Sequence, residues 1–177
     1  MPTTPALALP YPPPTGVAPD VPYYMQQLAE AVEAKLVPAV KPDHALVRAT
    51  VNQSLPDATT VTIVYGATLS SSGVTVNLAA GTLTVSKAGL YQCNGAVSYA
   101  GGAAGIRYAI ITVNGAEELA SGIPGGTGGY PTVTVAGLVK LAAGDVVRLI
   151  ANQSSGGALN TGTPKERTRM SLMRVSD

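Results

Sequence analysis

Tryptophan and phenylalanine are absent from the 177-residue sequence, which contains one cysteine and one histidine. The single cysteine, Cys93, excludes an intrachain disulfide and a metal site built on paired thiolates. No apolar run approaches the roughly 20 residues that cross a bilayer as a helix, so we expect no membrane partner. The N-terminus lacks the basic and apolar regions of a signal peptide, so we expect synthesis in a cytoplasm.

Charge is also scarce. Asp, Glu, Lys and Arg make up 12% of the chain, about half the usual share, and the formal net charge is +1. Because no basic block is present, we expect no nucleic-acid partner. Hydrophobic residues make up 46% of the chain. A monomer of this composition would expose an unusually apolar surface, so we expect part of it to be buried against other subunits.

The sequence contains none of the common catalytic patterns, such as G-x-S-x-G, H-E-x-x-H or C-x-x-C. His44, the only histidine, follows Asp43 in a proline-flanked segment, which we interpret as a solvated linker rather than an acid–base pair. Asp145 follows Gly144 and is interpreted as a turn cap rather than a metal ligand. We therefore expect a protein that is not an enzyme and that needs no cofactor or metal.

The beginning of the chain differs from the rest. Residues 1–19 contain the run PYPPP, which fixes φ and removes backbone donors, so an extended proline-rich arm is predicted. The arm is apolar rather than polar, and its apolar residues make it a candidate partner-binding segment. The candidate binding residues of the arm are Leu7, Leu9 and Tyr11.

Residues 20–37 predict one amphipathic helix, with Asp20 as N-cap and Pro22 in the first turn. An apolar stripe recurs at helical spacing and consists of Val21, Met25, Leu28, Val32 and Leu36. Residues 38–44, which include two prolines, predict a linker. Because so short a helix is marginal alone, its stripe must be buried against the β domain, against two symmetry mates, or against another protein.

Residues 45–177 predict β structure throughout. Runs of β-forming residues separated by turn residues predict nine strands, at 45–51, 59–65, 73–79, 82–86, 89–100, 105–113, 131–139, 145–153 and 169–175. Asn114-Gly115 predicts a two-residue hairpin turn. The glycine-rich segment 122–130 predicts an exposed distal loop, a place where recognition often occurs. Many short strands at this spacing indicate an antiparallel sandwich, barrel or jelly roll.

Two of these strands, 105–113 and 145–153, are apolar on both faces. A sheet that faces water on one side alternates apolar with polar residues, so these strands must be covered twice. We interpret one cover as the sandwich core and the other as a neighbouring subunit. The candidate interface residues are Tyr108, Ile110, Val146 and Ile150.

Four stretches of the β region resemble, in their order, the trimeric jelly-roll superfamily of tumour necrosis factor and the globular heads of collagen-like complement proteins. They are TLTVSKAGLYQCNGAVSY, GIRYAIITVNGAEE, VTVAGLVKLAAGDVVRLIANQ and RMSLMRV. The resemblance covers about residues 80 to 175. It implies an antiparallel jelly-roll head that forms a homotrimer around a threefold axis. Because such heads usually contain Phe and Trp, Leu, Ile and Tyr must fill the core here.

The stretch from about residue 6 to 36 resembles the openings of minor tail and appendage proteins of tailed bacteriophages of actinobacteria, through LPYPPPTG and PDVPYYMQQLAEAVEAKL. Together the resemblances imply a structural virion protein made in the host cytoplasm. It would be a trimeric tail appendage, attached to other virion proteins through residues 1–36, whose distal loops are candidates for contact with a host receptor. The alternatives are a capsid decoration protein or head fibre, and a receptor- or carbohydrate-binding module.

Overall fold

The structure, a computed structural model, describes Tyr23 and residues 25–32, 42–101, 104–126, 128–162 and 164–176, without the side chain of Glu166. The chain divides into two compact units, Met1–Pro42 and Asp43–Asp177. Each unit is described by itself, and the second is called the head below. The candidate residues Leu7, Leu9, Tyr11, Val21 and Leu36 lie outside the described residues.

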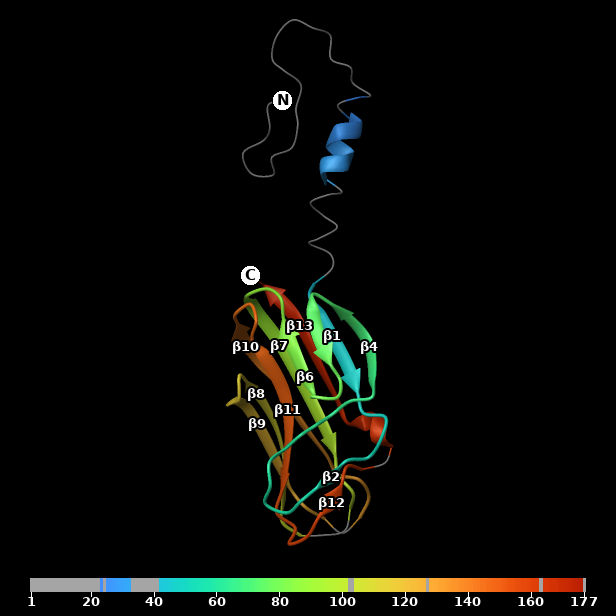
Figure 1. Ribbon diagram of the computed structural model, residues 1–177, viewed down its shortest axis with the longest axis vertical. Helices are drawn as coiled ribbons and strands as arrows, with labels where there is room; N and C mark the ends of the chain where they lie inside the picture. The colour runs from blue at the N-terminus through green and yellow to red at the C-terminus, as the bar shows by residue number, and fades with distance from the viewer. Residues whose placement is uncertain are drawn as a thin grey trace, which may run out of the picture. The chain divides into compact units, whose positions relative to one another are not determined.

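The first unit contains the predicted helix, which is helical over residues 25–32 (Figure 1). Gln26 Nε2 donates a hydrogen bond to Glu30 Oε1 at 2.9 Å, one helical turn away. Of the predicted apolar stripe, Met25 is exposed, while Leu28 and Val32 are half-buried. The short helix is therefore confirmed, and the described residues of its apolar stripe are partly exposed.

The head is a sandwich of two antiparallel sheets (Figure 1). The first sheet has five strands, in the order β10 (Thr132–Leu141), β7 (Gly89–Ser98), β13 (Arg169–Ser176), β1 (His44–Arg48) and β4 (Ala67–Ser72). The second sheet has the order β5 (Val74–Asn77), β6 (Thr82–Val85), β11 (Val146–Gln153), β8 (Ile106–Val113) and β9 (Ala116–Pro124), with β3 (Val61–Thr62) also paired to β11. The predicted mainly β, antiparallel sandwich is confirmed.

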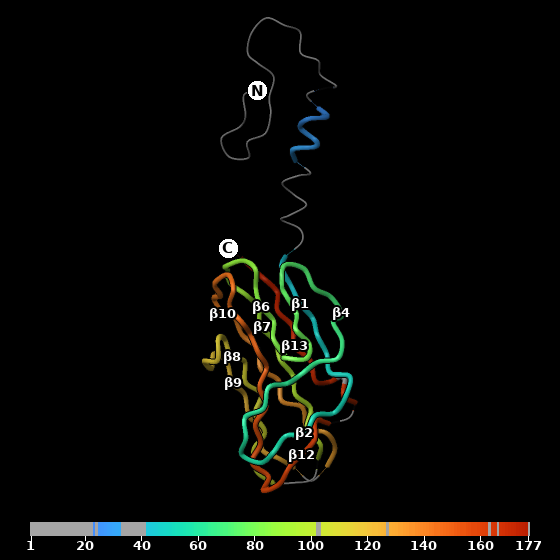
Figure 2. The backbone as a smooth tube through the Cα atoms, viewed as in Figure 1, coloured from blue at the N-terminus to red at the C-terminus, as the bar shows by residue number. Residues whose placement is uncertain are grey.

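Two minor elements complete the head. β2 (Ser54–Leu55) pairs with β12 (Leu159–Asn160), and one turn of 3-10 helix, η1 (Lys165–Arg167), precedes β13. β1 begins and β13 ends at one end of the head, while β2 and β12 lie at the opposite end, which is called the distal end below (Figures 1 and 2). The distal end is therefore the end away from both termini of the head.

Tyrosine supplies the aromatic side chains of the core, since the chain contains no Phe or Trp. Tyr65, Tyr91 and Tyr99 are buried among the aliphatic side chains between the two sheets. The Tyr99 hydroxyl donates to the backbone oxygens of Tyr108 and Asn152, so its polar end is satisfied inside the sandwich. Burial raises the pKa of Tyr65 and of Tyr99 above the ordinary value. The sequence-based expectation that Leu, Ile and Tyr would replace Phe and Trp is confirmed.

The predicted hairpin turn at Asn114-Gly115 is confirmed, since Val113 pairs with Ala116 across it. Both turn residues have positive φ, 51° and 90°, which suits asparagine and glycine. Asn114 Nδ2 also donates to Asp145 Oδ1 at 2.8 Å, and the other carboxylate oxygen of Asp145 accepts from the backbone N of Ala142 at 2.8 Å. Asp145 is thus a turn cap, as the sequence indicated.

Two edge strands escaped prediction, and one predicted strand is much shorter. β4 has the sequence ATLSSS and its residues are largely exposed, so it lacks the apolar alternation that marks a strand. β9 contains Gly122 and Pro124, which placed its end in the predicted 122–130 loop. Of the predicted strand 59–65, only Val61–Thr62 pairs. At a sheet edge, backbone pairing to one neighbour suffices to hold polar residues in a strand.

Cys93 should resist thiol reagents while the head is folded. Its side chain is fully buried on β7, and burial raises the pKa of the thiol to about 12, so almost no thiolate forms near neutral pH. We expect a disulfide-exchange reagent at pH 8 to label the native chain at a negligible rate and the urea-unfolded chain stoichiometrically. Rapid labelling of the native chain would contradict the burial of this strand.

Candidate subunit interface

The outward face of the five-stranded sheet exposes large apolar side chains. Cross-strand partners share a face, so His44, Met173, Gln92 and Leu138 form one row across β1, β13, β7 and β10. Leu138 is 55% exposed and Met173 is 46% exposed, and Val175 near the end of β13 is exposed to a similar degree. Isolated apolar residues are ordinary on a surface, but in one row they form a patch suited to another protein surface.

The next two rows of this face are small, polar or cationic. They consist of Ser70, Leu46, Ser171, Asn94 and Ala136, and of Ala67, Arg48, Arg169, Ala96 and Thr134. None of the three rows contains Asp or Glu. The face is therefore apolar near the end where β1 begins and positively charged farther along the strands.

The four interface residues predicted from sequence lie on the outward face of the other sheet. Ile110 and Ile150 pair directly across β8 and β11, and Tyr108 lies one row away. All four, Val146 included, are half-buried within a single chain. A Cβ at Gly122 would lie 2.8 Å from the Tyr108 ring, so the ring covers the neighbouring strand. The structure thus brings Tyr108, Ile110 and Ile150 together on a face where Ile106 of β8 is 41% exposed.

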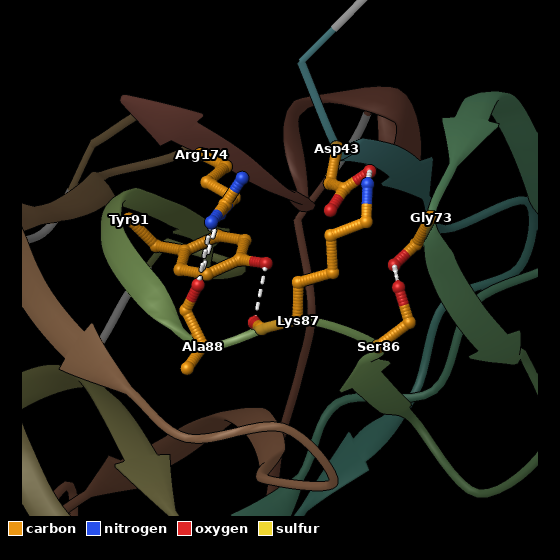
Figure 3. Close-up of polar contacts among 7 residues, drawn as sticks. All are labelled: Asp43, Gly73, Ser86, Lys87, Ala88, Tyr91 and Arg174. Carbon is orange, nitrogen blue, oxygen red and sulfur yellow. Dashed lines mark hydrogen bonds and ion pairs between the residues drawn. The ribbon is translucent and has the colours of Figure 1, made fainter. Parts of the chain in front are cut away.

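A polar cluster closes the end of the head at which β1 begins (Figure 3). The side chain of Asp43 is almost fully buried, and its Oδ1 lies 3.5 Å from Lys87 Nζ. Its backbone oxygen accepts from the backbone N of Arg174 at 2.8 Å. The other carboxylate oxygen, Oδ2, is buried without a hydrogen-bond partner in the described part of the chain. Asp43 therefore fixes the start of the head to the β6–β7 turn and to β13.

The same cluster holds the β6–β7 turn from its other side. Arg174 donates from Nε and Nη2 to the backbone oxygen of Ala88 at 3.0 and 2.8 Å, and the Tyr91 hydroxyl donates to the backbone oxygen of Lys87 at 2.9 Å (Figure 3). Burial raises the pKa of Tyr91, the charge of Asp43 raises it further, and Arg174 opposes both. The acceptors in this cluster are backbone carbonyl oxygens and the Asp43 carboxylate. The cluster therefore supports the fold.

The sequence-based interpretation of Asp43 and His44 as a solvated linker is wrong at both residues. Asp43 is buried, and His44 is the first residue of β1, so the predicted linker 38–44 extends too far. Adjacent residues of an extended strand point to opposite faces, so the side chains of Asp43 and His44 lie on opposite sides of the sheet. His44 Nε2 lies 2.7 Å from Ser70 Oγ on the outward face. The two residues form no acid–base pair.

The described residues include no group of three or more His, Cys, Asp and Glu side chains placed to hold a metal ion. Within the same ranges, no helix combines the length and the hydropathy that crossing a bilayer requires. The glycine-rich segment 122–130, predicted as a distal recognition loop, begins inside β9, and its last residue, Tyr130, is 48% exposed. Its recognition role stays a prediction.

The two packed antiparallel sheets define the head as a jelly-roll sandwich of the tumour necrosis factor type. The solved structure of murine APRIL matches it with a TM-score of 0.61 and 10% identity, over 76% of this chain and 100% of that chain. Eiger, a tumour necrosis factor from S. frugiperda, matches with a TM-score of 0.60 and 12% identity, over 77% of this chain and 94% of that one. No family model and no curated protein sequence matches the chain. At these identities the likeness shows the fold alone.

Proposed function

We propose that the chain is a non-enzymatic structural protein of a phage virion, a trimeric tail appendage. Residues 1–36 attach it to other virion proteins, and the head faces outward. The observation that carries the proposal is the division of the chain into a small N-terminal unit and a head of tumour necrosis factor type with an apolar outward face. A capsid decoration protein or head fibre would have the same architecture at a different position.

The subunit contact is assigned to the outward face of the five-stranded sheet. Threefold oligomers use heterologous contacts, in which one surface of a copy meets a different surface of the next. The row that contains Leu138 and Met173 supplies exposed apolar area, whereas Ile110 and Ile150 on the other sheet are half-covered by their own chain. Burying the first row against a second copy also accounts for the low charge content of the chain.

Virion membership is tested on purified particles. Mass spectrometry should find the chain among the particle proteins, and a gold-labelled antibody against the head should mark the tail in electron micrographs. Labelling of the capsid instead would support the decoration-protein alternative. Absence of the chain from purified particles, with the chain present in the infected cell, would overturn the proposal.

Leu28→Asp should prevent attachment while leaving the head intact. Leu28 is half-buried near the middle of the apolar stripe, and a carboxylate buried in an apolar contact without a partner costs several kcal/mol. The head has its own core, so its melting temperature should stay within about 2 °C of the wild type because the change lies outside it. Co-sedimentation with particles measures attachment.

The matched control is Ala29→Asp, which adds the same charge at the neighbouring, exposed residue of the same helix. Both changes replace a good helix former with the same poor one, so loss of helix propensity is comparable. If Leu28→Asp co-sediments as well as Ala29→Asp does, the helix stripe is not the attachment surface.

A further inference from the structure

Two arginines face each other on the outward face of the five-stranded sheet. Arg48, the last residue of β1, pairs in register with Arg169, the first residue of β13. Like charges placed directly opposite in an antiparallel pair destabilise it. Arg167, in η1, lies nearby and lines a surface concavity together with Arg169. These three residues are called the arginine row below.

Nothing in the described part of the chain neutralises this charge. The single ion pair found there joins Lys87 to Asp43 at the end of the head where β1 begins. No guanidinium of the arginine row makes a hydrogen bond to a described residue, and Arg48 Nε is buried without a partner. A buried N–H of a cation is costly to leave unpaired.

The face is hollowed beside the arginine row. One concavity, of about 380 Å³, is lined by Leu46, Asn94, Gly95, Ala96, Thr134, Val135, Ala136, Arg169 and Ser171. A second, of about 310 Å³, is lined by Ala96, Thr132, Thr134, Pro164, Arg167 and Arg169. Because they share Ala96, Thr134 and Arg169, the two adjoin. Their described lining includes guanidinium, hydroxyl and amide donors and no carboxylate.

Small residues of β7 leave this space open. Ala96 lies between Arg169 and Thr134 in the same row, and its methyl group fills little of the gap between them. The neighbouring Gly95 cannot carry a side chain, since a Cβ there would lie 2.6 Å from Leu149 Cδ1 in the core. A side chain at Gly95 would point into the core, so the hollow on the outward face follows from the small side chain of Ala96.

We infer that the arginine row binds a small oxyanion of the phosphate, sulfate or carboxylate class. The planar guanidinium presents paired N–H donors that match the spacing of oxyanion oxygens, and the threonine hydroxyls add neutral donors. One such ion with a few waters fits the volume of either concavity, given roughly 30 Å³ for each water.

This site deepens the proposed function and rests on it in one respect, because the face that holds the anion is the one assigned to the subunit contact. An unneutralised arginine row repeated in three copies around an axis opposes association. A bound anion lowers that repulsion. We therefore expect the anion to strengthen the proposed trimer.

Binding is tested by calorimetric titration of the full chain with inorganic phosphate, and separately with sulfate and acetate, at constant ionic strength in chloride. We expect saturable binding, weakened about tenfold or more in Arg169→Gln, since a hydrogen bond to a charged group is lost. Arg167→Gln should act in the same direction. Lys140→Gln is the control, because it removes one exposed positive charge of β10 that lines neither concavity.

Two outcomes overturn the site: no saturable binding by the wild-type chain, or equal affinities in Arg169→Gln and Lys140→Gln. Native mass spectrometry with and without phosphate separates this result from the proposed function. A trimer whose dissociation constant is the same with and without phosphate overturns the anion's role and leaves the trimer standing. A monomer that binds phosphate through Arg169 supports the site and overturns the proposed assembly.

Discussion

Leu138→Asp should convert the proposed trimer into monomers without unfolding the head. The side chain is exposed in a single chain and lies in the same row as Met173, with Gln92 between them. In a trimer the new carboxylate would be buried in an apolar contact three times over, at a cost of several kcal/mol each time unless it finds a partner. In the free monomer the carboxylate faces water, so folding should change by no more than about 0.5 kcal/mol.

Light scattering coupled to size-exclusion chromatography measures the change at micromolar concentration, and circular dichroism confirms the fold. The matched control is Ile106→Asp, which places the same charge at an exposed isoleucine of β8 on the other sheet. Monomers from Ile106→Asp and trimers from Leu138→Asp would move the interface to the face that contains Tyr108 and Ile110. A wild-type chain that is monomeric under these conditions would contradict the trimer itself.

Gln153→Met should destabilise the head by about 2 kcal/mol, because it removes the side-chain partner of two backbone groups at about 1 kcal/mol each, while the Gly157 oxygen keeps the Ser155 hydroxyl as a donor. The side chain is fully buried at the end of β11. Its Nε2 donates to the backbone oxygens of Leu55 and Gly157 at 3.1 and 2.8 Å, and its Oε1 accepts from the backbone N of Ser155 at 2.8 Å. Methionine has a similar shape but replaces none of these bonds.

Urea unfolding at equal protein concentration measures this loss. Gln26→Met is the control, because Gln26 is exposed on the helix outside the head and its amide donates to the side chain of Glu30. That variant should unfold within about 0.5 kcal/mol of the wild type. If both variants behave alike, the buried amide does not hold the distal loops, and the β2–β12 end of the head is stabilised by other contacts.

The sequence predicted those strands that carry a periodic apolar pattern and failed where pairing alone defines the strand. β8 and β11 could be predicted because Ile111 and Leu149 lie in continuous runs of β-forming apolar residues, and both side chains are buried in the core. β4 was not, since a run of serine beside Leu69 has no core face to reveal it. An edge strand pairs with only one neighbour and is partly exposed to water. Its composition therefore carries little information about the fold.

The same physics explains what was missed at the candidate interface. The apolar residues of β8 and β11 lie on both faces of single strands, so they could be found by reading along the chain. Leu138 and Met173 come from distant strands and meet only through the register of β10, β7 and β13. Arg48 and Arg169 are likewise brought together by pairing of the first strand with the last. The sequence held one signal for this face. Leu138 is an isolated large apolar residue on the polar face of β10, a strand that alternates apolar with polar residues.

The neighbourhood of β1 and β13 also determines how the head responds to mechanical force. The two strands run antiparallel, with His44 opposite Met173, so both ends of the head leave from the same side. Tension applied between these two ends would open the pair one hydrogen bond at a time, as a zipper opens. Tension between the N-terminal entry and the distal loops runs along the strands, perpendicular to their hydrogen bonds, and loads all of them in shear at once. A head pulled from its distal end while held by its N-terminus therefore resists in its stronger direction.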